Sequence, residues 1–177
     1  QRVRDMNDIV YRRAKTDDAE AIYVFGRQLL SETSLMLLYP DERAKSIDDM
    51  RFVIQRFQEM PCHFLINAWD GDLCVGEALC MGGQFKRNKH AGRIGVGILA
   101  SHYGRGVGKG LMRAIERVAE AIGIVRLDLT VMEHNKRAHH LYLSMGYKDE
   151  GINRHSLLVD GKWVNEIMMA KLLDEAA

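Results

Sequence analysis

A glycine-dense turn joins an apolar run to an amphipathic helix in residues 93–110, RIGVGILASHYGRGVGKG. Glycine adopts backbone conformations that other residues avoid, and it lets a ligand approach the main chain closely. A helix that begins directly after such a turn directs unpaired N–H groups and the positive end of its dipole toward the turn. The stretch therefore predicts a strand, a turn and a helix that bind an anionic ligand such as a phosphate.

Two common phosphate-binding motifs do not fit the spacing of these glycines. A Walker A loop needs Ser or Thr after the Gly108-Lys109 pair, where the chain has Gly110. It also needs Gly five positions before Gly108, where the chain has Tyr103. A dinucleotide-binding G-x-G-x-x-G motif that began at Gly104 would need Gly in place of Lys109. The turn is therefore expected to bind a different phosphate-bearing ligand.

Hydrophobic periodicity predicts strands and helices around this turn in the order β-α-α-β-β-β-α-β-α-β-β. The predicted strands span 9–14, 63–69, 73–81, 93–99, 125–131, 152–159 and 162–172. The predicted helices begin near the N-cap residues Thr16, Ser46 and Asn135 and after the glycine turn. This order predicts a single α/β domain over residues 9–177, preceded by an N-terminal tail at residues 1–8.

Charge does not indicate a nucleic-acid or membrane partner, because 25 basic and 24 acidic residues leave a net charge of +1. One basic loop, residues 84–92, is either a solvated turn or a contact for a cofactor phosphate. The sequence contains no long apolar span and no signal peptide. We therefore expect a cytoplasmic protein that binds neither nucleic acid nor membrane.

The three cysteines lack the spacing of a disulfide framework or a metal site. Cys74 and Cys80 are an even number of residues apart in one predicted strand, so we expect them to share a face as buried packing thiols. His102, His139 and His140 are expected at the surface. No spacing of His, Cys or carboxylates indicates a metal site.

Two motifs resemble signatures of the GCN5-related N-acetyltransferase (GNAT) superfamily. The first signature is Arg or Gln, two residues, Gly, one residue and then Gly or Ala, between the fourth strand and the third helix. Arg105 to Gly110 satisfies it literally, but the distance from the preceding strand favours Tyr103 to Gly108, with an aromatic residue at the first position. The second motif, LTVMEHNKRAHHLYLSMGYKDEG, resembles the family's L.V...N.RA..LY...GF...G.

The order of elements is also that of the family, so the resemblance covers nearly the whole chain. It implies a single-domain acetyltransferase fold of the α/β class, with a mixed central sheet of about seven strands and helices on both faces. It also implies acetyl-CoA as co-substrate, with its pantetheine arm in a gap between the fourth and fifth strands and its pyrophosphate at the glycine turn. The residues implied in this binding are Val96, Gly97, Ile98, Gly104, Arg105, Gly106, Val107, Gly108, Lys109 and Asn135.

The resemblance also implies roles in catalysis. Backbone N–H near Ile98 would hold the oxyanion that forms when an amine attacks the thioester. Tyr142 matches the family's general acid, which protonates the departing thiolate, whereas the residue read alone would be a core tyrosine on an apolar helix face.

The general base that deprotonates the amine has two candidates, Glu77 and Glu133. Glu77 interrupts one otherwise apolar face of its predicted strand, so it is either an edge residue that reaches water or a site residue. Glu133 is either the base or a solvated charge just before a helix cap.

The predicted function is transfer of the acetyl group of acetyl-CoA to a primary amine by direct attack in a ternary complex. Acceptor pockets in the family are built from the variable loop between the first two helices, here residues 31–43, and from the last hairpin. The stretch DGKWVNEIMMAKLL resembles members that acetylate small amines or, less often, protein N-termini. We expect a small cationic acceptor, because carboxylates are available to surround it: Glu32, Asp41, Glu42, Glu77 and Glu133.

Three alternatives stay open at this point: a protein N-terminal acetyltransferase, a CoA-binding module without catalysis, and a nucleotide-phosphate-binding protein. Turnover of acetyl-CoA with any amine would separate an enzyme from a binding module. Tight binding of ATP that excluded CoA would favour the third alternative. A homodimer is one assembly that we allow for.

Overall fold

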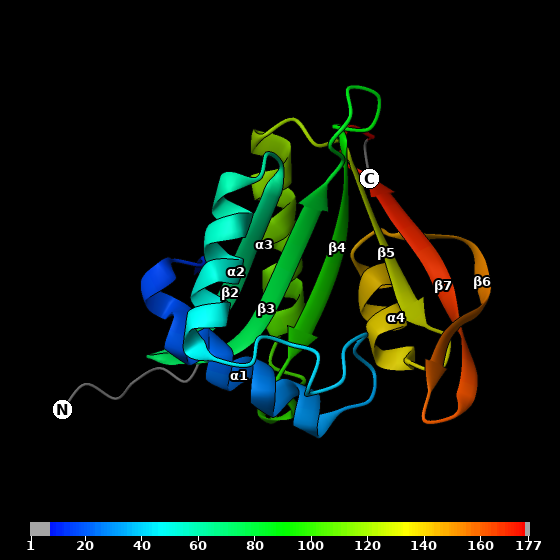
Figure 1. Cartoon of the computed structure of the whole chain (residues 1–177). Helices are drawn as coiled ribbons and strands as arrows, with labels where there is room; N and C mark the ends of the chain where they lie inside the picture. Colours follow the sequence, from blue (N-terminus) through cyan, green and yellow to red (C-terminus); the bar gives the residue numbers. More distant parts are fainter. Residues whose placement is uncertain (1–7, 176–177) are drawn as a thin grey trace.

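The structure is a computed structural model that describes residues 8–175, so the predicted N-terminal tail lies outside the described residues except for Asp8. The predicted order of elements is confirmed (Figure 1). The strands are β1 (Ile9–Arg13), β2 (His63–Asp70), β3 (Leu73–Gly82), β4 (Ala91–Ile98), β5 (Arg126–Met132), β6 (Lys148–Val159) and β7 (Lys162–Leu172). The α-helices are α1 (Ala19–Glu32), α2 (Ile47–Glu59), α3 (Val107–Ala121) and α4 (Lys136–Ser144). Short 3₁₀ turns, η1 (Thr16–Asp18) and η2 (Ala100–His102), precede α1 and follow β4.

All seven strands form one mixed sheet in the order β1-β2-β3-β4-β5-β7-β6. Neighbouring strands are antiparallel except β4 and β5, which are parallel. The parallel pair is short, because only 91–93 of β4 pair with 126–128 of β5. Beyond these residues the two strands diverge toward the lower edge of the sheet in Figure 1.

Helices cover both faces of the sheet, and each face has its own hydrophobic core. On one face α1 and α2 bury Phe25 and Ile54 against Trp69 of β2. On the other face α3 buries Leu111 and Ile115 against the central strands, and α4 adds Tyr142. Burial of apolar area on both sides stabilises the sheet as the middle layer of three. None of the described helices is both long and apolar enough to cross a membrane.

A β-bulge in β3 overturns one expectation about the cysteines. Ala68 of β2 pairs with Gly76 and Trp69 pairs with Cys74, so Val75 is an extra residue in β3. An extra residue reverses the alternation of side chains between the two faces. Cys74 therefore packs in the core under α1 and α2, whereas Cys80 packs in the core under α3. The predicted shared face is wrong, but both thiols are buried, and burial raises the pKa of each to about 12.

The predicted N-caps have different outcomes. The Ser46 and Asn135 side chains cap α2 and α4 by accepting the N–H of Asp49 and Ala138, which confirms those two predictions. Thr16 does not cap α1, because residues 16–18 form a 3₁₀ turn and the α-helix begins at Ala19.

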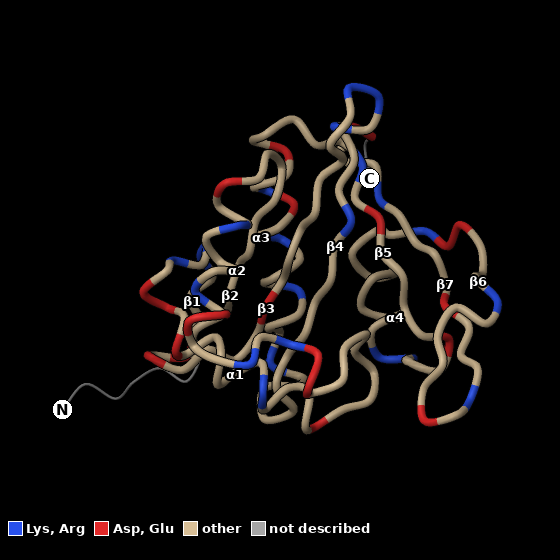
Figure 2. Tube along the Cα trace, in the orientation of Figure 1, with Lys and Arg blue, Asp and Glu red and all other residues tan. Residues whose placement is uncertain are grey.

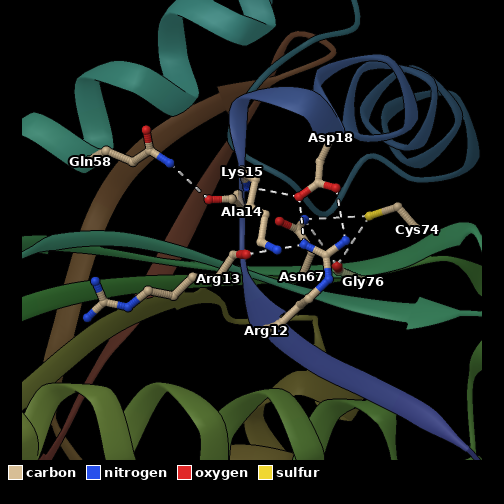
Figure 3. A network of polar contacts seen from close by, with 9 residues as sticks. All are labelled: Arg12, Arg13, Ala14, Lys15, Asp18, Gln58, Asn67, Cys74 and Gly76. Carbon is tan, nitrogen blue, oxygen red and sulfur yellow. Dashed lines mark hydrogen bonds and ion pairs between the residues drawn. The ribbon is translucent and has the colours of Figure 1, made fainter.

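The start of α1 is instead held by a polar network in which Asp18 is central (Figure 3). Arg12 donates two hydrogen bonds to the Asp18 carboxylate, at 2.7 and 2.9 Å, and the Lys15 N–H donates a third at 2.8 Å. These donors hold the pKa of Asp18 below its usual value. In the same view, the buried Asn67 side chain donates to the Gly76 carbonyl beside the bulge.

Candidate active site

The end of β4 presents one free backbone edge toward the gap beside β5. Residues 96–98 pair with 76–78 of β3, and none of the described strands pairs with their other edge. The Leu99 N–H donates to the Val75 carbonyl of β3 at 3.0 Å. Because successive N–H groups of a strand point to opposite edges, the Ile98 N–H points into the gap. Such an edge can pair with an extended ligand that carries amide groups.

The glycine turn that follows β4 depends on backbone conformation rather than on lack of space. Gly104 and Gly106 have φ angles of +71° and +80°, in the left-handed region that favours glycine. A Cβ at either position would meet no atom within 4 Å, so the main chain of the turn is open to a ligand. Gly106 is the N-cap residue of α3, and the helix therefore begins at the turn as predicted. The first N–H groups of α3 are available to an anion there.

Two neighbouring residues of the predicted set have packing roles. The Val107 side chain is buried in the core, so only its main chain faces the turn. A Cβ at Gly108 would come within 2.8 Å of Leu141 in α4 and 3.3 Å of Ile98 in β4. The absence of a side chain at residue 108 therefore lets α3 and α4 meet at the end of β4.

Tyr103, which occupies the first position of the signature, is covered by a cation from another element. The Arg137 guanidinium, in the first turn of α4, lies 3.8 Å from the centre of the Tyr103 ring. A contact of this kind contributes about 0.5–1 kcal/mol at an exposed site. The pair joins the loop after β4 to α4 across the gap. No pattern in the sequence indicated this role of Arg137.

His102 is buried, so its expected surface position is wrong. Its ring nitrogens lie 2.8 Å from the Ser101 hydroxyl and 3.0 Å from an Asp70 carboxylate oxygen. The same carboxylate lies 3.8 Å from the Arg105 guanidinium. Asp70, at the end of β2, thus contacts both His102 and Arg105 and holds the connection between β4 and α3 against the β2–β3 hairpin.

Tyr142 lies on the buried face of α4, two turns after the N-cap residue Asn135. Its ring packs against that of Tyr147, with 6.0 Å between the ring centres. Burial raises the pKa of Tyr142 to about 12, so the phenol keeps its proton throughout the neutral range. Leu141, the residue before it, contacts the start of α3 beside Ile98. A neutral phenol is thus positioned on the helix that borders the gap.

Glu77 lies in the inner strand β3 and is buried, so it is not an edge residue that reaches water. Arg43, in the loop between α1 and α2, donates to its two carboxylate oxygens at 3.1 and 3.0 Å. The structure therefore gives the Glu77 carboxylate a cationic partner that the sequence analysis did not anticipate.

Glu133 follows β5 and is half-buried. Its carboxylate accepts a hydrogen bond from the Asn165 side chain at 3.2 Å, and its N–H donates to the Asn165 carbonyl at 3.0 Å. Glu133 is thus held against β7 at the end of the strand that forms the other side of the gap. Among residues 8–175 no group of three His, Cys, Asp or Glu side chains is close enough to hold a metal ion.

A cavity of about 520 Å³ lies between the end of α1, the α1–α2 loop (residues 33–46) and the tip of the β6–β7 hairpin. The hairpin is joined to the loop by the Tyr39 hydroxyl, which accepts the N–H of Asp160 at 3.2 Å. The lining mixes apolar side chains with polar ones, the apolar set including Leu30, Met36, Leu37, Leu157, Leu158 and Val159 and the polar set Ser31, Thr33 and Ser34. Of the expected carboxylates, Glu32 and Glu42 line the cavity, whereas Glu77 does not.

The carboxylates at the cavity are themselves hydrogen-bonded. Glu32 accepts the N–H of Ala100 at 2.9 Å, which joins the end of α1 to the segment after β4. Glu42 accepts the N–H of Tyr39 at 2.8 Å.

The basic loop at residues 84–92 leads into β4 and lies at the far end of that strand from the glycine turn (Figure 2). Its position does not suit contact with a phosphate at the turn.

The model of the acetyltransferase (GNAT) family matches residues 28–147. An L-amino acid N-acetyltransferase of Escherichia coli K12 is 28% identical over 170 residues, which cover 94% of this chain and 99% of the relative. A ribosomal protein uS5-alanine N-acetyltransferase of the same organism is 35% identical over 68 residues, which cover 36% of this chain and 35% of the relative.

Solved structures share the fold over nearly the whole chain. A GNAT-family acetyltransferase from Streptococcus pneumoniae superposes with a TM-score of 0.88 at 25% identity, covering 94% of this chain and 99% of the other. The yncA protein of Salmonella typhimurium, solved with its cofactor acetyl-CoA, has a TM-score of 0.83 at 18% identity, with 96% of each chain covered. The mixed sheet with helices on both faces is therefore the arrangement found in these proteins.

Proposed function

Because the chain belongs to the acetyltransferase (GNAT) family, we propose that it transfers the acetyl group of acetyl-CoA to the primary amine of a small molecule. The observation that carries this proposal is the free edge of β4. It is followed, after the short turn η2, by the open glycine turn at the start of α3. An extended ligand with amides at one end and phosphates at the other fits that sequence of groups.

Acetyl-CoA supplies an activated thioester, and this chain has groups suited to each part of it. The β4 backbone at Val96, Gly97 and Ile98 would pair with the amide-bearing arm. The main chain from Gly104 to Lys109 would bind the pyrophosphate, and the exposed Arg105 and Lys109 side chains would add positive charge. We propose Asn135, whose side chain caps α4, as a further residue beside the cofactor.

Three residues around the gap have separate proposed roles in the reaction: Ile98, Tyr142 and Glu133. The Ile98 N–H is directed to hold negative charge on an acyl oxygen, and loss of one such donor costs about 3–4 kcal/mol in other acyl-transfer enzymes. We propose that Tyr142, protonated and buried, donates the proton that the leaving thiolate needs. Glu133 is the better candidate for the base that takes the proton of the amine, because Glu77 is engaged by Arg43.

The cavity beside the α1–α2 loop supports a small acceptor. A volume of about 520 Å³ suits a small molecule, and the mixed polar and apolar lining suits an acceptor that carries groups of both kinds. Glu32 and Glu42 would favour the cationic form of an arriving amine. The similarity to an L-amino acid N-acetyltransferase over nearly the whole chain favours an α-amine on such a molecule.

A protein N-terminus is the second candidate acceptor, favoured by the shorter match to an acetyltransferase that acts on a ribosomal protein's alanine. A thiol-release assay with three acceptor sets would decide between the two: free amino acids, small diamines, and a peptide with an N-terminal alanine. We expect release with a small amine, at a kcat/KM at least about tenfold above that of the peptide. Activity on the peptide alone would favour the second candidate. Tight binding of CoA without release on any amine would indicate a binding module.

A further inference from the structure

The Arg43–Glu77 ion pair joins the α1–α2 loop to the middle of the sheet. Both side chains are largely buried, with 16% and 9% of their surfaces exposed. The guanidinium donates to both carboxylate oxygens, which is the geometry that fixes orientation as well as distance. Because a buried charge is costly when its partner is missing, any movement of the loop that separates the pair is unfavourable.

A glycine in the interior of α1, Gly26, makes room for this arginine, although glycine lowers helix propensity. A Cβ at Gly26, in the interior of α1, would lie 2.1 Å from the Arg43 Nε atom. Glycine within a helix is less favourable than alanine, so its presence here fits a need for close approach. A second guanidinium nitrogen contacts the buried Met50 sulfur of α2 at 4.0 Å. Arg43 thus lies between α1, α2 and β3.

The ion pair is adjacent to the strand edge proposed for the acyl donor. Glu77 pairs in register with Gly97 of β4. A Cβ at Gly97 would come within 3.2 Å of the Met36 methyl group, which belongs to the same loop as Arg43. The loop therefore lies over β4 at residue 97, and its next residues line the cavity.

We propose that Arg43 is a positioning residue for the acceptor: its pair with Glu77 holds the α1–α2 loop over β4 and so shapes the cavity. The ion pair uses both oxygens of Glu77, so Glu77 serves this arrangement and not proton transfer. The inference rests on the proposed function for its kinetic consequence. The attachment of the loop is a separate property that can be measured without turnover.

The experiment compares Arg43→Met, Glu77→Gln and the double variant by two measurements. In chymotrypsin digestion of the folded proteins, cleavage after the exposed Leu37 and Leu38 should be at least about fivefold faster in each single variant. In steady-state kinetics, the acceptor KM should rise about tenfold while the KM for acetyl-CoA changes less than about twofold. The double variant should be no worse than the worse single variant, because the pair acts as a unit.

Gly26→Ala keeps both charges but removes the space for the guanidinium, so it should reproduce the faster cleavage and the higher acceptor KM. Arg43→Lys keeps the charge without the two-point contact and should give intermediate values, which covers the case in which Arg43→Met does not fold. The matched control is Arg51→Met, which removes an exposed ion pair with Asp48 and should change neither measurement.

Two results would overturn the proposal. Wild-type cleavage in folded Gly26→Ala and Arg43→Lys proteins would show that the pair does not hold the loop. A large loss of kcat with an altered pH profile in Glu77→Gln, alongside unchanged kcat in Arg43→Lys, would make Glu77 the base instead. If the wild type acetylates no amine, the proposed function fails, and the digestion result still decides whether the pair attaches the loop.

Discussion

Tyr142 keeps its phenolic proton up to a pH about two units higher than an exposed tyrosine does, because burial raises its pKa. An exposed phenol has a pKa near 10, and burial raises the pKa of Tyr142 to about 12. The raised value favours the neutral form, so the residue remains a proton donor up to about pH 12. A falling limb near pH 10 in the rate profile is therefore not expected from Tyr142.

Replacement of Tyr142 by Phe keeps the ring in the core and removes only the hydroxyl. We expect kcat to fall by about 10²–10⁴, the range for loss of a general acid, while the Kd for CoA changes little. Steady-state kinetics and calorimetry measure the two quantities. Wild-type turnover in Tyr142→Phe would assign the proton to another donor.

The sequence motif pointed to Tyr142 and Asn135 because both occur at fixed spacing within one short helix. Arg43 and Arg137 gave no such signal. Arg43 meets a partner 34 residues away in the chain, and Arg137 meets Tyr103 across the gap. Contacts of this kind depend on how elements pack, which periodicity does not report.

At the scale of elements, the glycine turn is the part of the site that sequence predicted best. Its strand, turn and helix were expected, and Gly104 and Gly106 adopt the left-handed conformations that the turn requires. The bulge at Val75 was not predictable, because β3 is buried on both faces and its sequence shows no regular alternation of apolar and polar residues that an extra residue would interrupt. That single residue places Cys74 and Glu77 under α1 and α2, and it explains why the predicted apolar face of β3 was wrong in part.

Gly106→Val tests the turn as a phosphate site. Valine is strained at a φ of +80°, and its Cβ would enter the open space in front of the turn. We expect the Kd for CoA to rise at least about tenfold, measured by calorimetry on the folded protein.

The matched control for the turn is Gly123→Val, just after the end of α3 and so at the opposite end of that helix from the turn. Gly123 also has a positive φ, +85°, and equally open space around its Cβ position. It should show comparable loss of stability without loss of CoA affinity. Equal affinity in the two variants would place the phosphate site elsewhere.

At the scale of the whole molecule, the two cores on opposite faces of the sheet make stability sensitive to alkaline pH. Each core holds a thiol whose pKa is raised by burial from 9.0 to about 12. Because the folded-state pKa is raised, the stability is fully present below pH 9 and is lost as pH rises toward 12. The unfolded chain loses the thiol protons first in that window.

We expect the free energy of unfolding to fall by about 2 kcal/mol for each thiol between pH 8 and pH 10.5, in addition to the effect of Tyr142 at higher pH. Urea unfolding at the two pH values measures it. Cys80→Ala should be less stable at pH 8 but should lose about 2 kcal/mol less than the wild type at pH 10.5. A wild-type pH dependence in Cys80→Ala would contradict the assignment.

The acceptor cavity also depends on the whole fold, because it forms between segments that are distant in the chain. The sequence indicated these segments but not how they pack together. Tyr39 and Asp160, which meet at its edge, are 121 residues apart. Of the five carboxylates expected around the acceptor, two line the cavity, Glu32 and Glu42. Asp41 lies outside the lining, Glu77 is paired with Arg43, and Glu133 is hydrogen-bonded to Asn165. The identity of neighbours at such distances is fixed by the packed fold.

If acetyl-CoA binds along β4 with its pyrophosphate at the glycine turn, the amide groups there should exchange more slowly when CoA is bound, which hydrogen–deuterium exchange with and without CoA measures. Pairing of the β4 edge and of the first N–H groups of α3 should slow exchange in peptides that cover residues 95–110. Exchange in the basic loop at residues 84–90 should stay unchanged, because that loop lies at the other end of β4. Protection confined to other parts of the chain, with none in 95–110, would contradict the account.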